Sequence, residues 1–460
     1  MGALCLRLNS VFGQILKCIP SSLYKYKMAM TIDAPTEKEL SMIRKHLRFE
    51  IPQTYFAKRK KIPSKPPLTF YSLSPTQARV PLLFGSALRE VVPNQDKPSF
   101  PFKFTGELLE RQVSVCEEAT NYLTTYGTVI LNLYTSFGKT VIGAYLSAQR
   151  GLRTFILCPG KILSPQWTKT FRNFTDAKVF VVEERGIFPT DEQVIVCLET
   201  RISYLPSEIL DTIGCLILDE ADRLCTLTGI SAMLAISPSY VLVETATLER
   251  SNKHHEMLYM VAGKDTFIRR INDKPFRVIQ LDTQLYFETP RKENGDTDWS
   301  ALVKEMQANS ERNDIIVKVV RAFPLSKILI LTSEKSHVQH LYERLSVVEP
   351  CDYLMGNKKS YQDTRILIGT VSKLGRGFDE QAFCPDFNGT RIDLLIMCSS
   401  YRSVTVIEQT AGRAFRSDFP QVVHLYDNNS ILGGHWKIAR KWYKSRMGEV
   451  EYRTVDRLTD

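Results

Sequence analysis

Short runs of apolar residues recur along the chain after residue 105, and each is four or five residues long. Such runs are typical of strands buried on both faces of a parallel sheet. A first series comprises Val129–Leu133, Thr154–Cys158, Val194–Leu198, Cys215–Leu218 and Tyr240–Val243. A second series follows a charged stretch near Arg291–Asp298 and comprises Ile328–Leu331, Ile366–Gly369, Leu394–Cys398 and Val422–Tyr426.

Segments with helical periodicity lie between these runs, as at Val141–Ala148 and Val338–Leu345. Strands that alternate with helices over this length predict an α/β fold with two doubly wound parallel sheets in tandem. We expect a basic N-terminal segment or accessory domain over residues 1–105, a first α/β domain over 106–270, a second over 271–445 and a tail over 446–460.

The basic charge of the chain is concentrated at its N-terminal end. The 460 residues carry a net charge of +10, but residues 1–105 hold 17 Lys and Arg against 6 Asp and Glu, and the remainder is nearly neutral. The densest point is Lys58-Arg59-Lys60-Lys61. A solvated basic face explains such a tetrapeptide, but a whole segment of this charge favours contact with nucleic-acid phosphates.

Other classes of protein are disfavoured. The ten cysteines form no CxxC pair, which argues against a zinc site or a disulfide framework. No run reaches the roughly 18 uncharged apolar residues that a membrane span needs. We therefore expect an intracellular protein with no membrane partner.

The segment Leu133–Thr140, with the sequence LYTSFGKT, joins an apolar strand to a helix. Backbone N–H groups at such a junction bind phosphate, the lysine reaches the β- and γ-phosphate oxygens, and the threonine can hold Mg²⁺. These roles would fall to Lys139 and Thr140. The glycine-rich pattern is incomplete, because Leu133 and Ser136 stand where glycines are common, so an ordinary strand–helix turn remains an alternative.

Acidic residues follow another apolar strand in the sequence Leu216-Ile217-Leu218-Asp219-Glu220-Ala221-Asp222, 80 residues after Lys139. Buried carboxylates are costly unless they are paired or metal-bound. Asp219 can bind Mg²⁺ through water, and Glu220 can act as the general base for an attacking water. A solvated loop is the alternative for any single one of these acids.

A third element, Gln409–Arg416 with the sequence QTAGRAFR, follows the second series of strands. Arg413 and Arg416 are three residues apart, so a helix would place them on one face. Such a pair can stabilise charge on a transferring phosphoryl group, with Gln409 beside it. A surface salt-bridge face is the alternative.

In combination and in order, these segments resemble the motifs of superfamily 2 helicases over residues 105–445. The resemblance implies two RecA-like domains with ATP and Mg²⁺ in the cleft between them. It assigns adenine recognition to Gln112 and coupling of hydrolysis to domain movement to Asp222, Thr245, Ala246 and Thr247. The further ATP-binding residues that it implies are Thr135, Ser136, Phe137, Gly138, Gly377 and Asp379. Its expected nucleic-acid contacts outside the basic segment are Gly160, Thr200, Arg201 and Thr370.

Shorter matches narrow the resemblance to one branch of the superfamily. They are FGKT, Pro159 with Gln166-Trp167, Glu311-Arg312-Asn313 and Gly377-Phe378-Asp379-Glu380. The branch is similar to the transcription/repair-factor helicase, phage recombination helicases and large-DNA-virus helicases, including the poxvirus transcript-release enzyme. The basic N-terminal segment and the residues from Asp427 to Tyr443 are most similar to the viral members.

Three functions are compatible with these features. The favoured one is a monomeric, ATP-hydrolysing DNA helicase or translocase that works with viral transcription or replication machinery in the host cytoplasm or nucleus, or in the virion. The second is an RNA-directed helicase. The third, suggested by Leu133 and Ser136, is a nucleic-acid-binding scaffold with an inactive ATPase, which the intact Lys139, Glu220 and Arg416 disfavour.

Overall fold

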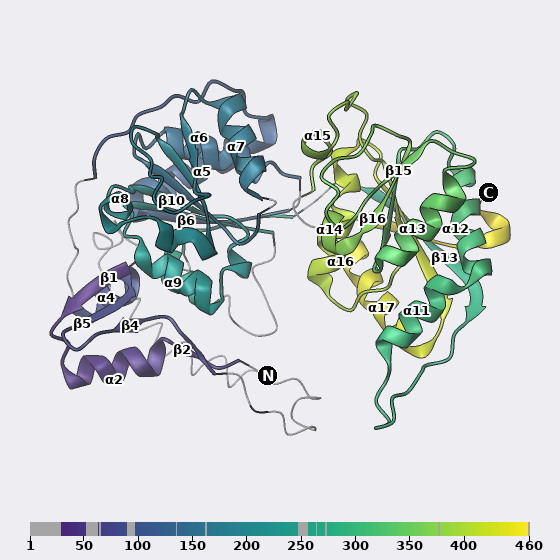
Figure 1. Cartoon of the computed structure of the whole chain (residues 1–460), viewed down its shortest axis with the longest axis horizontal. Helices are drawn as coiled ribbons and strands as arrows, with labels where there is room; N and C mark the ends of the chain where they lie inside the picture. Colours follow the sequence, from purple (N-terminus) through teal and green to yellow (C-terminus); the bar gives the residue numbers. More distant parts are fainter. Residues whose placement is uncertain are drawn as a thin grey trace. The chain divides into compact units, whose positions relative to one another are not determined.

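The chain divides into two compact units, which meet in the sequence near Arg270. The computed structural model describes residues 29–51, 63, 66–89, 97–134, 136–161, 163–246, 256–263, 265–271, 274–375 and 378–458. Each unit contains one seven-stranded sheet whose paired strands all run parallel. We call them the first lobe and the second lobe (Figure 1).

The first lobe is a parallel sheet covered by helices on both faces. The strands are, in spatial order, β12 (Phe267–Arg270), β6 (Thr128–Leu133), β11 (Tyr240–Thr245), β10 (Cys215–Leu218), β7 (Thr154–Cys158), β9 (Val194–Leu198) and β8 (Val179–Val181). The helices are α5 (Glu110–Tyr126), α6 (Lys139–Ala148), α7 (Leu163–Phe174), α8 (Ser207–Asp211), α9 (Leu227–Ala235) and α10 (Glu256–Ala262), with short 3₁₀ helices η2 (Glu199–Tyr204) and η3 (Ala221–Arg223). Helices α5, α6 and α7 lie on one face and α9 on the other (Figure 1).

The described part of the basic segment packs on the α9 side of the first lobe. It consists of β1 (Ala29–Asp33), α2 (Glu37–His46), β2 (Arg48–Phe49), β3 (Leu68–Thr69), β4 (Ser72–Leu73), β5 (Gln77–Pro81) and α4 (Leu82–Arg89). Strands β1, β5 and β4 form a small antiparallel sheet. The buried side chains of Ile32, Phe70 and Val80 share one hydrophobic core with Ile230 and Met233 of α9. The described part of this segment is therefore built into the first lobe.

The second lobe repeats the plan of the first. Its strands are, in spatial order, β15 (Cys351–Leu354), β16 (Ile366–Thr370), β14 (Ile328–Thr332), β17 (Leu394–Met397), β18 (Gln421–Asn428), β13 (Phe276–Tyr286) and β19 (Gly448–Thr454). The helices are α11 (Trp299–Ala308), α12 (Ser310–Ala322), α13 (Lys335–Leu345), α14 (Val371–Leu374), α15 (Glu380–Phe383), α16 (Val404–Ala411) and α17 (Ser430–Ser445), with 3₁₀ helices η4 (Ala414–Arg416) and η5 (Val455–Arg457).

Alternate residues of the second sheet belong to two different hydrophobic layers. Ile328 and Ile330 of β14 pack with α12 and α13, whereas Leu329 and Leu331 pack with the cluster that includes α16 and α17. Because successive side chains of a strand point to opposite faces, a fully apolar strand such as this one supports helices on both faces of the sheet. The α/β fold with two tandem RecA-like lobes is thereby confirmed.

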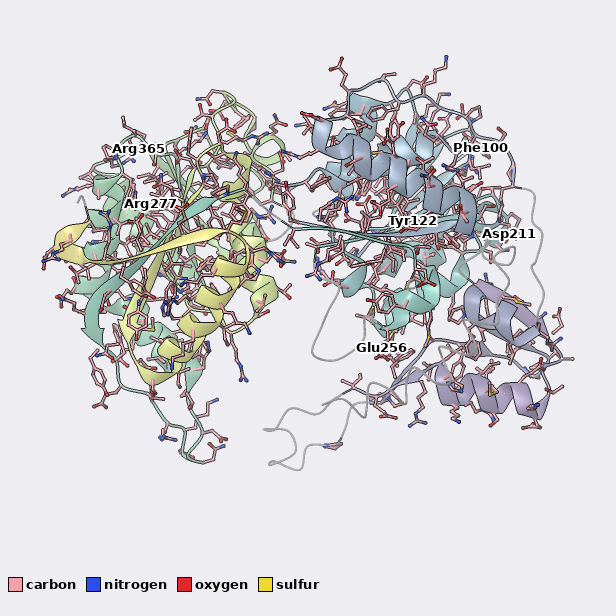
Figure 2. The ribbon with its side chains drawn as sticks, turned by 180° about the vertical axis from the view of Figure 1, so that it is seen from behind. Phe100, Tyr122, Asp211, Glu256, Arg277 and Arg365 are labelled. Carbon is pink, nitrogen blue, oxygen red and sulfur yellow. The ribbon has the colours of Figure 1, made fainter. Side chains whose placement is uncertain are left out.

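Residues 446–460 differ from the expected tail, since most of them form β19 and η5 of the second lobe. Strand β19 pairs along β13 from Phe276 to Asp282. Arg277 reinforces this edge, because its Nε lies 2.8 Å from Oε1 of Glu451 (Figure 2). Among the described residues, no helix is both long and apolar enough to cross a membrane.

Candidate functional site

The loop between β6 and α6 has the backbone of a phosphate-binding turn. Gly138 is the N-cap of α6 and has a φ of 94°, a conformation that glycine adopts without strain. A Cβ atom at this position would lie 2.3 Å from Nε2 of Gln112. Ser136 also has a positive φ, 75°, at the position where helicases commonly have glycine. Phe137 between them is buried.

Lys139 and Thr140 begin α6 at the carboxyl end of β6. The Lys139 ammonium donates a 3.0 Å hydrogen bond to the carbonyl of Leu133, the last residue of the strand. The Thr140 hydroxyl accepts a 3.3 Å hydrogen bond from Nε2 of Gln166 on α7. A cation and a hydroxyl therefore lie at a helix N-terminus, where backbone N–H groups and the helix dipole favour anions.

Asp219 follows β10 and is 7% exposed. Its Oδ2 accepts a 2.7 Å hydrogen bond from the indole Nε1 of Trp167, and its Oδ1 accepts one of 2.8 Å from the backbone N–H of Glu220. Burial and the neighbouring charge of Glu220 raise the pKa of Asp219 to about 6, against the opposing effects of the Trp167 bond and Lys139. A cation beside this carboxylate would lower its pKa again.

Adjacent side chains of α7 thus hold two groups of the site at once, since Gln166 bonds Thr140 and Trp167 bonds Asp219. The ammonium of Lys139 acts electrostatically on the same carboxylate. An ammonium, a hydroxyl and a carboxylate form a donor set that fits nucleotide phosphates with Mg²⁺. Lys139, Thr140 and Asp219 are the residues that could hold them.

Glu220 has a strained backbone, with a φ of 43° although it is not glycine. Strained residues of this kind concentrate at functional sites. Its Oε2 lies 2.9 Å from Nη1 of Arg223, one turn further along η3. Nη2 of Arg223 reaches the Pro159 carbonyl at 3.5 Å, next to Gly160. The candidate base is therefore held on the loop that follows β10.

Gln112 on α5 is buried against the phosphate-binding turn. Its amide Nε2 donates to the carbonyls of Phe137 and Gly138 at 3.1 and 3.3 Å, and its Oε1 accepts from the backbone N–H of Leu109 at 2.9 Å. The residue expected to recognise adenine therefore also contacts the loop expected to bind phosphate.

Two of the predicted coupling residues contact each other. The Thr245 hydroxyl donates to Oδ1 of Asp222 at 3.1 Å, which joins the ends of β11 and β10. The carbonyl of Ala246 accepts a 2.9 Å bond from Nδ2 of Asn132 on β6. Thr247 lies outside the described residues.

Sequence reasoning missed Glu244, which precedes Thr245 on β11. This carboxylate is fully buried, and neither of its oxygens has a hydrogen-bond partner among the described residues. A Cβ atom on Gly143 of α6 would lie 2.7 Å from its Oε1, so the side chain packs directly under the helix that Lys139 begins. Burial, reinforced by the charge of Asp219, raises the pKa of Glu244 well above its ordinary value. The one available signal was a lone acid in the apolar run VLVET.

In the second lobe, Arg413 and Arg416 lie side by side but not on one α-helix. Helix α16 ends at Ala411, and both arginines belong to the following turn and η4. Arg413 is buried and donates to the carbonyls of Phe378 and Gly375 at 2.6 and 3.0 Å. Arg416 donates to the Phe378 carbonyl at 3.3 Å and lies 3.0 Å from Oδ2 of Asp379. The expectation of a shared helical face was wrong in detail, because the helix ends first.

The remaining predicted residues are distributed as follows. Gln409 is buried on α16, and Thr370 is buried at the end of β16 with its hydroxyl 3.0 Å from that of Ser372. Thr200 is exposed on η2, while Arg201 donates from Nη1 to the Val182 carbonyl at 2.8 Å. The residues that lie outside the described part of the chain are Lys58, Arg59, Lys60, Lys61, Thr135 and Gly377.

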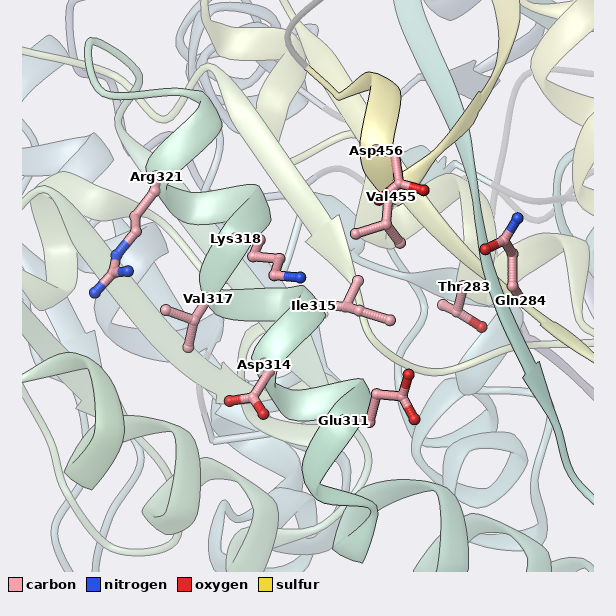
Figure 3. Close-up of a pocket in the computed structure, with 10 residues that line it drawn as sticks. All are labelled: Thr283, Gln284, Glu311, Asp314, Ile315, Val317, Lys318, Arg321, Val455 and Asp456. Carbon is pink, nitrogen blue, oxygen red and sulfur yellow. The ribbon is translucent and has the colours of Figure 1, made fainter.

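A cavity on the second lobe lies apart from all these residues. It has a volume of about 410 Å³ and is bordered by α12, the irregular end of β13 and η5 (Figure 3). Glu311, Asp314 and Asp456 bring three carboxylates to its wall, beside Lys318 and Arg321. None of the residues expected to bind ATP or nucleic acid lines it.

Comparison with known proteins confirms the resemblance to superfamily 2 helicases. The family described as "Type III restriction enzyme, res subunit" matches residues 105–250, which contain the candidate ATP-binding residues of the first lobe. Together with the viral relatives described below, this match indicates an ATP-hydrolysing enzyme of the helicase class.

Among viral proteins, the chain is 28% identical to protein 161L of Invertebrate iridescent virus 6, which is named as a helicase, over 81% of this chain and 89% of that protein. It is 23% identical to the transcript termination protein of Monkeypox virus over 66% of each chain. Dbp5 of Saccharomyces cerevisiae, in a structure described as bound to RNA and ADP BeF3, has the same fold with a TM-score of 0.52. That likeness has 13% identity and covers 81% of this chain and 93% of Dbp5.

Proposed function

We propose that this protein is a DNA-directed helicase or translocase that couples ATP hydrolysis to movement along a strand during viral transcription or replication. One observation carries the proposal. Neighbouring side chains of α7 hydrogen-bond Thr140 and Asp219, and the charge of Lys139 lowers the pKa of the same Asp219 carboxylate. Burial raises the pKa of Asp219 although its carboxylate accepts two hydrogen bonds, and a bound cation would offset this unfavourable effect of burial.

ATP with Mg²⁺ would supply the phosphoryl group and a divalent charge that neutralises its oxygens. In the chain itself, the Lys139 ammonium would exchange the Leu133 carbonyl for phosphate oxygens, and the backbone N–H groups of α6 would bind the same phosphates. Glu220 would accept a proton from water at a carboxylate oxygen. Gln112 would link adenine recognition to the loop, since it already bonds that loop.

The second lobe would contribute positive charge during turnover. Arg413 and Arg416 are held by Gly375, Phe378 and Asp379, and we propose that they stabilise charge on the phosphoryl group when the lobes close. The Asp222–Thr245 contact would transmit closure between the ends of β10 and β11. Nucleic acid would lie along Gly160, Thr200, Arg201 and Thr370, with the basic segment around Lys58–Lys61 as an additional clamp.

DNA is the favoured substrate, because the shorter motifs resemble the DNA-directed branch. An RNA-directed helicase is the second candidate, and it is favoured by the fold shared with Dbp5, whose structure is described as bound to RNA. The transcript termination protein among the relatives supports a partner in the transcription machinery. The protein would act in the host cytoplasm or nucleus as a monomer.

The deciding experiment measures ATP hydrolysis by the full chain with single-stranded DNA, duplex DNA and RNA of equal length. We expect stimulation by DNA to exceed stimulation by RNA. Lys139→Ala should abolish turnover and leave nucleic-acid binding intact, whereas the control Lys169→Ala, on the exposed side of α7, should change neither. Stimulation by RNA alone would identify RNA, and not DNA, as the substrate. The absence of any ATP hydrolysis by the wild type would refute the proposal that the protein is an ATPase.

A further inference from the structure

A second cavity on the second lobe lies beside the carboxyl end of β17 and has a volume of about 530 Å³. This volume is within the usual range for small-molecule sites. Trp299, at the start of α11, and His435, on α17, lie against each other in its wall, with ring centroids 5.1 Å apart and ring planes tilted by 56°. Tyr401 and Arg402 line another side, from the loop between β17 and α16.

The chemistry of this cavity differs from that of the cavity in Figure 3. The three carboxylates of that cavity would repel a phosphate backbone, whereas the lining of this one includes Arg402 and no carboxylate. Trp299 keeps 37% of its surface exposed, although large aromatic side chains are usually buried. Burial and the neighbouring charge of Arg402 lower the pKa of His435, which favours the uncharged form of its ring.

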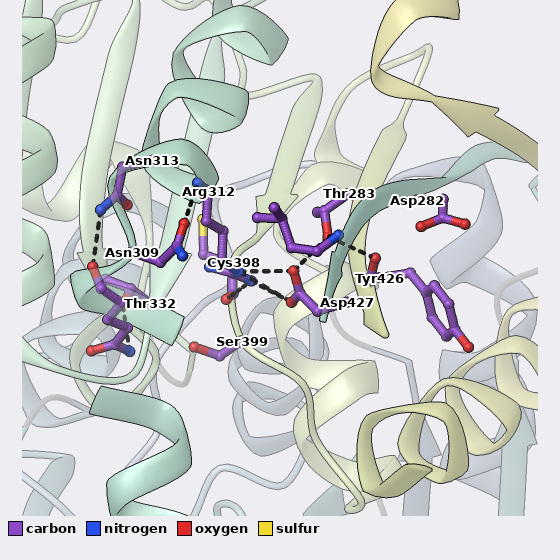
Figure 4. Close-up of polar contacts among 12 residues, drawn as sticks. Asp282, Thr283, Asn309, Arg312, Asn313, Thr332, Cys398, Ser399, Tyr426 and Asp427 are labelled. Carbon is purple, nitrogen blue, oxygen red and sulfur yellow. Dashed lines mark hydrogen bonds and ion pairs between the residues drawn. The ribbon is translucent and has the colours of Figure 1, made fainter. Parts of the chain in front are cut away.

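Buried polar contacts hold the walls of the cavity in place. Arg312 of α12 is 1% exposed, pairs with Asp427 at the end of β18, and donates from Nη2 to the Cys398 carbonyl at 2.8 Å (Figure 4). Cys398 directly precedes the loop that carries Tyr401. The Ser399 hydroxyl accepts a 2.8 Å bond from that of Ser333, which follows β14.

The two helical walls are fixed by their N-caps. The side chain of Asp298 accepts from the backbone N–H of Ala301 and so fixes the first turn of α11, where Trp299 lies. Asn429 caps α17 and also donates to the Phe287 carbonyl at 2.8 Å. Arg312 and the Asp427-Asn428-Asn429 segment therefore support the walls of this cavity.

The location also points to a ligand. In parallel α/β sheets, ligands bind outside the carboxyl ends of the strands. Thr370 of β16 is opposite Thr332 of β14 at this edge, and Leu331 of β14 is opposite Met397 of β17. A strand that passes Thr370, the expected nucleic-acid contact, would reach Ser333 and then the loop of Tyr401.

We infer that this cavity binds an unpaired base of a single strand, stacked on the partly exposed ring of Trp299, which His435 supports, with Arg402 beside its phosphate. The inference rests on the proposed function. Every base can stack on an aromatic ring, so the cavity would bind a translocating strand independently of its nucleotide sequence. A strand whose backbone alone was bound would gain nothing from these rings.

The test compares binding of the full chain to fluorescent dT20 and to an abasic oligonucleotide of the same length, without ATP. The wild type should bind dT20 more tightly. Trp299→Ala should weaken binding to dT20 by about tenfold and leave binding to the abasic strand unchanged, because only stacking is lost. Trp299→Phe should retain most of the affinity, and Phe419→Ala, which removes an 82% exposed ring of the same lobe outside the cavity, should change nothing.

The outcomes separate this inference from the proposed function. If Trp299→Ala lowers the midpoint of thermal unfolding, the Trp299→Leu variant is used in its place, because leucine keeps most of the apolar volume and cannot stack on a base. Equal weakening on both strands, or no weakening, would overturn the base site while the function stands. A wild type that binds neither strand, and whose ATPase no nucleic acid stimulates, would overturn both.

Discussion

The indole Nε1 of Trp167 donates a 2.7 Å hydrogen bond to Oδ2 of Asp219, and both side chains are buried. The bond links α7 to the acid that leaves β10, and it opposes the effect of burial, which together with the charge of Glu220 still raises the pKa of Asp219 to about 6. Gln166, the neighbouring residue, bonds Thr140 of the phosphate-binding loop. Helix α7 therefore positions both sides of the candidate Mg²⁺ site.

Trp167→Phe should shift the acid limb of the pH profile of kcat/KM for ATP hydrolysis, which reports the free enzyme, upward by about one unit. The indole bond lowers the pKa of Asp219, which is about 6 with the bond present, so its loss raises the pH at which the carboxylate becomes protonated. Activity should then fall more at pH 6.5 than at pH 8. The matched control is Trp442→Phe, because the buried Trp442 indole N–H has no hydrogen-bond partner among the described residues. Identical profiles for both variants would contradict a role for this bond.

Glu244→Leu should stabilise the first lobe, and more so at high pH. The folded-state pKa of Glu244 is raised above 4.5, so the wild type loses stability as the pH rises from about 4.5 toward that folded-state pKa. The leucine variant lacks this loss and removes an unpaired buried polar group, which costs about 1–3 kcal/mol. Thermal unfolding at pH 5 and pH 8 measures the difference, with Glu117→Leu on the exposed side of α5 as control. A gain independent of pH would mean that Glu244 does not titrate in this range.

Arg413→Ala and Arg416→Ala should both reduce turnover, by about 10³-fold if they act as arginine fingers, with ATP affinity little changed. They should differ in stability. Arg413 is buried and bonds the Phe378 and Gly375 carbonyls, so its loss also lowers the unfolding midpoint. Steady-state ATPase, nucleotide titration and thermal unfolding separate the effects, and Arg321→Ala, at an exposed position of α12, is the control. Unchanged turnover in both variants would indicate that the two arginines have only a structural role.

Reversal of Lys58, Arg59, Lys60 and Lys61 to glutamate should weaken DNA binding and make it less sensitive to salt. For duplex DNA, the slope of log K against log salt becomes shallower by about 0.9 for every phosphate that the protein no longer neutralises. Truncation near residue 105 is a poorer test, because Ile32 and Phe70 belong to the core of the first lobe. Reversal of the exposed Lys441 and Lys444 on α17 serves as control. An unchanged salt slope would indicate that the basic segment faces a protein or solvent instead.

All nine strands that the sequence predicted are interior strands of the two seven-stranded sheets, and the strands of these sheets that it missed lie at or next to the edges. Thr154–Cys158, Val194–Leu198 and Cys215–Leu218 are β7, β9 and β10 with the same bounds. Strands β8, β12, β15 and β19 are edge strands, and β13, which was also missed, lies beside β19. An edge strand is only partly covered, so its sequence need not be continuously apolar and gives a weaker signal.

For the site, the sequence by itself determined the prediction of which residues would carry the chemistry, because a strand–GKT–helix segment and an acidic strand end each need only a few neighbouring residues. Only the tertiary structure decided how they are supported. The bonds of Trp167 to Asp219, Gln112 to Gly138 and Arg312 to Asp427 span 52, 26 and 115 residues. Such partners come together through sheet order and helix packing, which local periodicity does not encode, and the burial that forces these polar groups to pair exists only once both lobes have folded.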